Sequence, residues 1–125
     1  MLNFSDIFVA IAAESWSEVV VFYRGLFGCD PVVYSSERYA EFQVQGVKLG
    51  IFKPSAHHRA EFQKPAGALG LCLEVENLEE AIATIKQLGG AVQGEITQAS
   101  HGRECYAYDP ARNRLILHQA WANNT

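Results

Sequence analysis

One histidine and three glutamates occupy predicted strand positions from which they could do chemistry. Alternation within the strands predicts that their side chains point away from the helices; the residues are His118, Glu41, Glu74 and Glu104. A histidine near carboxylates can act as a base, as a hydrogen-bond donor or as part of a metal site. The opposing interpretation is a surface histidine at a strand end with solvated carboxylates, because isolated charges avoid burial. Both interpretations stay open from the sequence.

A set of aromatic residues falls on the same predicted strand faces: Phe8, Tyr39, Phe52, Tyr106 and Tyr108. Aromatic walls with a few polar groups between them suit a flat organic ligand held by stacking and hydrogen bonds. Sheets are also rich in aromatic residues for packing reasons alone, so the same rings could fill a cleft or an interface. The pattern indicates a small-molecule site without identifying the molecule.

The other histidines and the cysteines give weaker indications. His57, His58 and His101 fall in turn-like segments, where we expect surface residues. The three cysteines are widely spaced and form no CxxC pair, which argues against a disulfide framework and against a structural zinc site. We expect Cys72 and Cys105 to be small packing residues of strands rather than catalytic thiols.

The composition is that of a globular protein. Of the 125 residues, 49% are hydrophobic and 19% are charged, and the formal net charge is −4. No basic run appears, which argues against a nucleic-acid partner. No apolar run approaches the ~18 residues of a membrane helix, and no signal segment opens the chain. We therefore expect a soluble, cytoplasmic protein without a membrane partner.

The elements that would position the candidate residues occur twice in the chain. When the sequence is shifted by 62 positions, Val9 falls on Leu71 and Gly28 falls on Gly90. Each copy has an alternating apolar run, a polar cap, an amphipathic helix and a glycine stop. Each copy is then followed by three further apolar runs of strand length. The chain therefore repeats one βαβββ plan.

The predicted element bounds follow from this plan. In the first copy we predict a strand over 4–13, a helix that starts at a capping box (Ser15 to Glu18) and ends at Gly28, and strands over 31–35, 39–45 and 47–53. In the second copy we predict a strand over 68–76, a helix capped by Asn77 and ended by Gly89 and Gly90, and strands over 91–99, 103–108 and 114–119.

These elements define an α+β fold of two βαβββ modules. In each module the helix covers one sheet face and leaves the other bare. Two such modules can form a curved mixed sheet around a cleft, with the helices on the outer face, and the cleft would bind the ligand. We assign 1–54 to module one, 55–67 to a linker with one helical turn and 68–125 to module two, and treat 1–125 as a single domain.

Three motifs in this order make the chain resemble the vicinal oxygen chelate superfamily, which holds glyoxalase I, extradiol dioxygenases, fosfomycin-resistance enzymes and bleomycin-binding proteins. The motifs are FYRGLFG at 22–28, EVENLEEA at 74–81 and DPARNR at 109–114. The resemblance covers nearly the whole chain and implies a homodimer. Arg112 stands where the family turn usually has glycine; a positive φ there would cost about 1–2 kcal/mol.

The resemblance also implies a divalent metal held by His, Glu or Gln side chains on the first and last strands of the modules. Carried over by position, the four ligand sites in this chain are Phe8, Gly50, Gly70 and Ile116. None has a ligating side chain, and a metal needs charged or imidazole donors. We therefore expect no metal at the standard site and no cofactor, and we assign no catalytic residue.

The preferred interpretation is a protein that binds or sequesters a small organic molecule, in the manner of the bleomycin-resistance branch. The residues predicted to line the site are Phe8, Glu41, Gln43, Phe52, Tyr106 and His118. The main alternative is a lyase, isomerase or dioxygenase that uses a displaced metal held by His118 and nearby glutamates. A third possibility is an interaction module whose cleft is filled by the aromatic residues.

Overall fold

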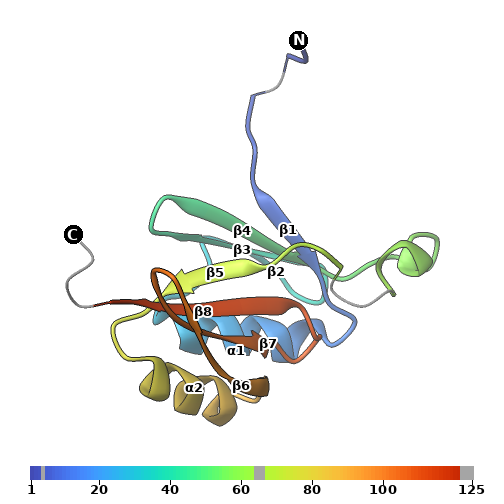
Figure 1. Cartoon of the computed structure of the whole chain (residues 1–125). Helices are drawn as coiled ribbons and strands as arrows, with labels where there is room; N and C mark the ends of the chain where they lie inside the picture. The colour runs from blue at the N-terminus through green and yellow to red at the C-terminus, as the bar shows by residue number, and fades with distance from the viewer. Residues whose placement is uncertain (4, 64–66, 122–125) are drawn as a thin grey trace. The chain divides into compact units, whose positions relative to one another are not determined.

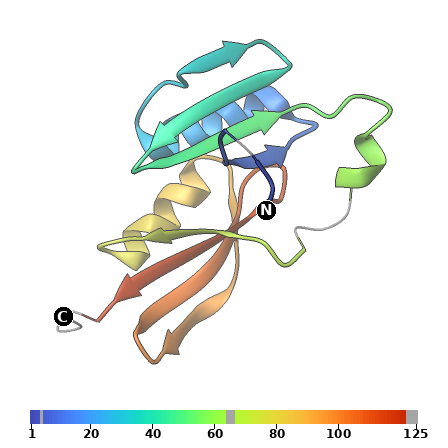
Figure 2. The same cartoon turned by 90° about the horizontal axis from the view of Figure 1, so that it is seen from above.

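A computed structural model describes residues 1–3, 5–63 and 67–121 of the chain. The chain divides into two compact units, unit one (Met1–Phe62) and unit two (Gln63–Thr125). Among the described residues, each unit contains one α-helix and one four-stranded sheet, and the colours of Figure 1 and Figure 2 separate the units along the chain. The predicted α+β class and the two βαβββ modules are confirmed.

Unit one pairs its strands in the order β1-β4-β3-β2, with β1 parallel to β4 and the other neighbours antiparallel. The α-helix α1 follows β1 and lies against β4. The elements are β1 (Val9–Ala12), α1 (Trp16–Phe27), β2 (Val33–Ser35), β3 (Tyr39–Val44), β4 (Val47–Phe52) and the short 3-10 helix η1 (Arg59–Phe62).

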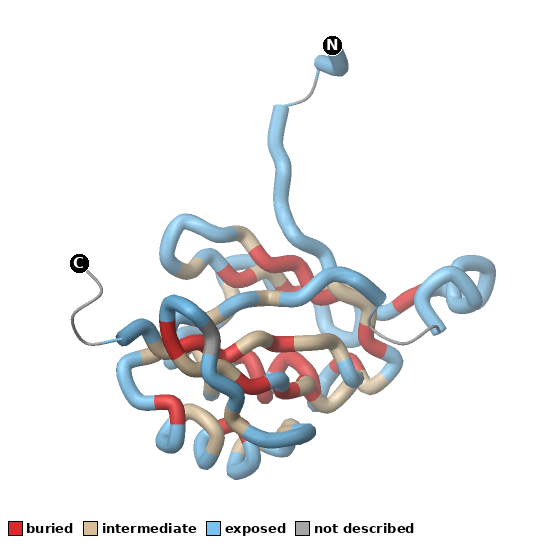
Figure 3. The backbone as a smooth tube through the Cα atoms, in the orientation of Figure 1, coloured by how far each residue is buried: buried red, intermediate tan, exposed pale blue. Residues whose placement is uncertain are grey.

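The core of unit one lies between α1 and one face of the sheet. Phe22 of α1 is fully buried, as are Phe42 of β3 and Ile51 of β4. Figure 3 draws such positions in red. The indole Nε1 of Trp16 donates to the carbonyl oxygen of Ile51 at 2.9 Å, which satisfies the one polar atom that this buried ring carries. The alternation predicted for β3 and β4 is confirmed.

Unit two repeats the plan in the order β5-β8-β7-β6, with β5 parallel to β8. The pairing of β6 with β7 shifts register between Gln93 and Thr97. Leu78 and Ile85 of α2 are fully buried, as are Leu115 and Leu117 of β8. The elements are β5 (Leu71–Glu74), α2 (Leu78–Gln87), β6 (Ala91–Ala99), β7 (Gly102–Tyr108) and β8 (Arg114–Ala120).

The two helices begin differently. Ser15 occupies the N-cap of α1 but its side chain makes no capping hydrogen bond, so the predicted capping box is wrong. Its backbone, at φ −86° and ψ 57°, departs from the extended conformation that such caps usually have. Asn77 caps α2 as predicted, because its side chain accepts from the amide of Glu80 at 3.0 Å. Gly28 ends α1 in the left-handed conformation, as predicted.

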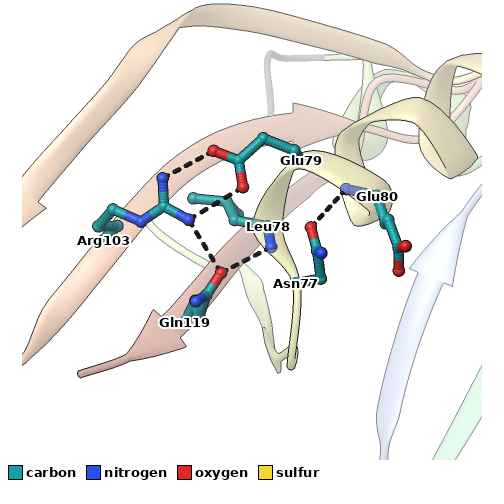
Figure 4. Close-up of polar contacts among 6 residues, drawn as sticks. All are labelled: Asn77, Leu78, Glu79, Glu80, Arg103 and Gln119. Carbon is teal, nitrogen blue, oxygen red and sulfur yellow. Dashed lines mark hydrogen bonds and ion pairs between the residues drawn. The ribbon is translucent and has the colours of Figure 1, made fainter. Parts of the chain in front are cut away.

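A second side chain, that of Gln119, accepts a hydrogen bond from a backbone amide at the start of α2. The side-chain oxygen of Gln119 accepts from the amide of Leu78 at 2.8 Å and from the guanidinium of Arg103 at 3.0 Å (Figure 4). The same guanidinium forms two hydrogen bonds with the Glu79 carboxylate, at 2.7 and 3.0 Å. The last strand, β7 and the first turn of α2 are thus joined through polar side chains.

Several predicted strands are longer than those observed. Of the strand predicted over 4–13, the described residues form only Val9–Ala12, which is the part that pairs with β4, and position 4 lies outside the described residues. Residues 31 and 32 lie outside β2. The helical turn predicted in the linker is η1, and positions 64–66 of that linker lie outside the described residues. No helix among the described residues is long and apolar enough to cross a membrane.

Candidate functional site

We call the surface of the unit-one sheet that points away from α1 the open face. Ala40, Phe42, Leu49 and Ile51 are buried on the helix side, so the residues that alternate with them point the other way. Strand register then sets the neighbours on this face. The side chains of this face belong to Phe8, Ala10, Ala12, Val33, Ser35, Tyr39, Glu41, Gln43, Lys48 and Phe52, and Gly50 lies among them.

Gly50 allows Tyr39 to lie across the middle strand of this face. A Cβ atom on Gly50 would stand 2.6 Å from the phenolic oxygen of Tyr39 and 2.8 Å from its Cε1. Real Cβ atoms do not approach other atoms so closely, so any other residue here would displace the ring. The phenol of Tyr39 therefore occupies the space that a side chain at position 50 would use.

The Glu41 carboxylate accepts hydrogen bonds from two other side chains of the open face. The phenol of Tyr39 donates to one carboxylate oxygen at 2.8 Å, and the amide of Gln43 approaches the other at 3.4 Å. Desolvation, followed by the interaction with Glu41, raises the pKa of Tyr39 to about 12. The phenol thus stays protonated at neutral pH and keeps donating to the carboxylate.

The positive charge on the open face is already paired. Lys48 bonds to Asp6, and this hydrogen bond is the main cause that raises the pKa of Lys48 and lowers the pKa of Asp6. The Lys48 ammonium also lies 5.4 Å from the centre of the Phe8 ring. Phe8 is 47% exposed, so its ring is partly free for contact with a ligand.

Phe52 has a partner outside the sheet. Its ring packs edge-to-face against Phe62 of η1, with the ring centres 5.0 Å apart. Phe52 is half-buried and Phe62 is exposed. The 3-10 turn predicted in the linker therefore contributes an aromatic contact to one end of the open face.

The unit-two sheet holds a histidine–glutamate pair. Nδ1 of His118 lies 2.7 and 2.9 Å from the two carboxylate oxygens of Glu74, which also accept the amide of Ala120 at 3.0 Å. His118 is only 6% exposed, so the predicted alternative of a surface histidine is wrong. Its ring stacks beside His101 with centres 4.7 Å apart.

Nε2 of His118 is buried and has no hydrogen-bond partner. A Cβ on Gly102 would stand 2.8 Å from this nitrogen and would also overlap the carbonyl oxygen of Gln119. Because Gly102 has no side chain, the backbone at the start of β7 can lie close to the imidazole. The nitrogen that Glu74 leaves free is therefore buried beside Gly102 and has no hydrogen-bond partner.

Tyr106 and two of the cysteines, Cys72 and Cys105, lie on strands of unit two. Tyr106 pairs with Ile116 in the register of β7 and β8 and is 48% exposed. Cys72 is exposed and Cys105 is buried, and desolvation raises the pKa of both thiols. Thiols with raised pKa values are poor nucleophiles at neutral pH. The burial of Cys105 agrees with the predicted packing role, whereas Cys72 is exposed.

The residues at the four standard metal-ligand positions do not fit a metal. Phe8 and Ile116 have hydrocarbon side chains, and Gly50 and Gly70 have none. A Cβ on Gly70 would already meet Cδ1 of Ile116 at 3.2 Å. Within each unit, the described residues form no group of three or more His, Cys, Asp or Glu side chains that could hold a metal ion.

The structure brings together part of the predicted site. Glu41, Gln43 and Phe52 share the open face with Phe8, whereas Tyr106 and His118 belong to unit two. Sequence reasoning placed Tyr39 on this face by alternation but did not foresee its position over Gly50. It also missed Asp6, because a residue that precedes the paired part of a strand gives no periodic signal.

The sequence and the fold were compared with those of known proteins. A family model described as Glyoxalase/Bleomycin resistance protein/Dioxygenase superfamily matches residues 8–117. No curated protein matches the sequence. The chain is similar in structure to protein ATC0852 from Agrobacterium tumefaciens, with 26% identity, a TM-score of 0.76, and coverage of 92% of this chain and 96% of that one.

Two further similar structures carry functional names. A glyoxalase-related enzyme from Fulvimarina pelagi has 16% identity and a TM-score of 0.75, over 93% of this chain and 88% of that one. The fosfomycin resistance protein FosX from Listeria monocytogenes has 16% identity and a TM-score of 0.73, over 98% of both chains. At this identity the likeness shows a shared fold.

Proposed function

This chain belongs to the Glyoxalase/Bleomycin resistance protein/Dioxygenase superfamily, and from that premise we propose that it binds or sequesters a small organic molecule without a metal at the standard site. The observation that best supports this proposal is the position of Tyr39, which lies over Gly50 and donates a hydrogen bond to Glu41. The phenol occupies the space where the resemblance leads us to expect a metal-ligating side chain at position 50, and it donates to the Glu41 carboxylate. Such a pair binds organic ligands by hydrogen bonds and needs no metal.

The open face supports this proposal with groups of two kinds. Phe8 offers a partly exposed ring for stacking. Glu41 and Gln43 of β3 offer hydrogen-bonding atoms on the same face, with β4 between them and β1. A flat molecule lying across β4, from Phe8 to β3, would contact both kinds of group at once. Tyr106 and His118 stay predicted ligand-binding residues of unit two.

The alternative of a metal-dependent lyase, isomerase or dioxygenase with displaced ligands has one observation in its favour. Glu74 holds Nδ1 of His118, as carboxylates often do when the other ring nitrogen binds a metal. That other nitrogen is buried. Within the described part of unit two, no set of three donors accompanies it. We therefore favour the binding protein.

By resemblance to the family we also propose a cytoplasmic homodimer in which residues 1–125 act as one domain. Size-exclusion chromatography with light scattering tests the dimer directly. A monomer at micromolar concentration would contradict that part of the proposal and leave the binding proposal unchanged.

The binding proposal can be tested by nuclear magnetic resonance with a library of aromatic fragments. We expect some fragments to shift the backbone amide signals of residues 39–52, and Phe8→Ala to weaken their binding several-fold. Val21→Ala is the matched control, because Val21 is an exposed apolar residue on α1. No shift in that range with any fragment at millimolar concentration would overturn the proposal.

A further inference from the structure

Resting on the proposed function, we infer that the ligand of the open face is an organic cation with a flat apolar part, and that its positive group pairs with Glu41. The charges of the open face, the donors that hold Glu41 and the aromatic rings on the same face all favour a ligand of this class.

Neutral groups hold the Glu41 carboxylate in place. Tyr39 and Gln43 donate to its two oxygens, and neither side chain carries a charge. Hydrogen bonds of this kind orient a carboxylate without cancelling its charge. Each oxygen keeps a further lone pair that can accept from a ligand.

The nearest cation on this face is already balanced. Lys48 pairs with Gln43 in the register of β3 and β4, so it neighbours Glu41 diagonally on the same face, but its ammonium bonds to Asp6. Two carboxylates therefore face one ammonium, and the three groups together carry one negative charge. A cationic ligand would neutralise this negative charge, whereas an anionic ligand would add a second uncompensated negative charge.

The surroundings increase the preference for a cation. Glu41 is half-buried, so its charge is less screened by water than that of a free surface carboxylate. Phe8 and Phe52 lie on the same face, and aromatic rings attract cations through their electron-rich faces. Ala10 is exposed and has only a methyl group, so it leaves the surface low beside Gly50.

Three probes with one ring and different charge test the inference: benzamidine, benzamide and benzoate. Benzamidine is a planar cation with paired N–H donors that match a carboxylate, benzamide is its neutral counterpart, and benzoate is an anion. Binding is measured from the shifts of the backbone amide signals of residues 39–52. We expect benzamidine to bind about tenfold more tightly than benzamide, and benzoate to bind least. Added salt should reduce the preference for benzamidine.

Glu41→Gln keeps the shape of the side chain and removes its charge. We expect it to lower benzamidine affinity about tenfold and to leave benzamide affinity nearly unchanged. Glu18→Gln, at an exposed position of α1, is the matched control and should change neither. Equal binding of all three probes, or preference for benzoate, would overturn the cationic class and leave the binding proposal standing. No binding of any probe at residues 39–52 would overturn the inference, and the fragment library decides the wider proposal separately.

Discussion

At the scale of single residues, the open face depends on the absence of a side chain at Gly50. The alternation of β3 predicted that Tyr39 and Glu41 share a face, because strand periodicity can be read directly from the sequence. That periodicity cannot reveal that the Tyr39 ring crosses to the neighbouring strand. Such a contact depends on pairing register, which is set by the whole sheet.

Gly50→Ala should move Tyr39 away from Glu41. The new Cβ would meet the far end of a flexible side chain, so we expect a loss of about 1 kcal/mol in the free energy of unfolding. We also expect the pKa of Tyr39 to fall from about 12 toward its ordinary value of 10. Spectrophotometric titration of the phenols, with Tyr39→Phe to identify the signal, measures this. An unchanged phenol titration would show that Gly50 does not set the position of the ring.

Arg112 was predicted to be strained if its turn needs a positive φ, and the structure gives φ 69°. Its guanidinium lies 5.6 Å from the centre of the Tyr108 ring, which partly compensates. Arg112→Gly should therefore stabilise the protein by up to about 1 kcal/mol, measured by urea denaturation. Arg112→Lys retains both the charge and the backbone strain and should not stabilise. A clear destabilisation by Arg112→Gly would show that the side-chain contact outweighs the strain.

At the scale of elements, the sequence predicted both helices but misjudged one of their starts. Ser15 and Glu18 have the spacing of a capping box, yet the backbone at Ser15 does not place its hydroxyl on a helix amide. Asn77 has the extended conformation that a cap needs. Local spacing thus indicates where a helix starts, whereas the chain entering from the preceding strand decides whether the cap forms.

Asn77→Ala should therefore cost more stability than Ser15→Ala. We expect a loss of about 1 kcal/mol for Asn77→Ala, because the Glu80 amide loses its acceptor, and a change of a few tenths for Ser15→Ala. Urea denaturation of the two variants compares them under the same conditions. Equal losses would indicate that Ser15 caps α1 in solution.

The Arg103–Glu79 pair ties β7 to the first turn of α2 and makes stability depend on pH. Its hydrogen bonds lower the pKa of Glu79 from 4.5 to about 2. The contribution of the pair is therefore fully present above pH 4.5 and is lost as the pH falls toward 2.

Glu79→Gln should lower the Tm at pH 6 relative to the unmodified protein, and this difference should shrink as the pH falls from 4.5 to 2. Glu95→Gln, an exposed strand residue, is the control and should show no such trend. Thermal unfolding followed by circular dichroism at several pH values measures it. A difference in Tm that stays constant across this range would exclude the ion pair as its cause.

At the scale of the whole molecule, the internal repeat was the strongest feature of the sequence. It predicted two βαβββ modules, and both are present with the same strand order and one helix each. It predicted much less about the site, because function depends on a few side chains that the repeat does not constrain. The buried His118, the Asp6–Lys48 pair and the close packing of Tyr39 over Gly50 required the folded chain. The predicted cleft shared by the modules stays a prediction.

The central claim is that this family member binds its ligand without a metal at the standard positions. The most direct test is the metal content of protein purified without chelator, followed by titration with Mn, Fe, Ni and Zn. We predict substoichiometric metal and no rise in Tm with any of the four ions. One tightly bound ion per chain, with a rise in Tm on reloading, would contradict the claim and direct the search for ligands to His118.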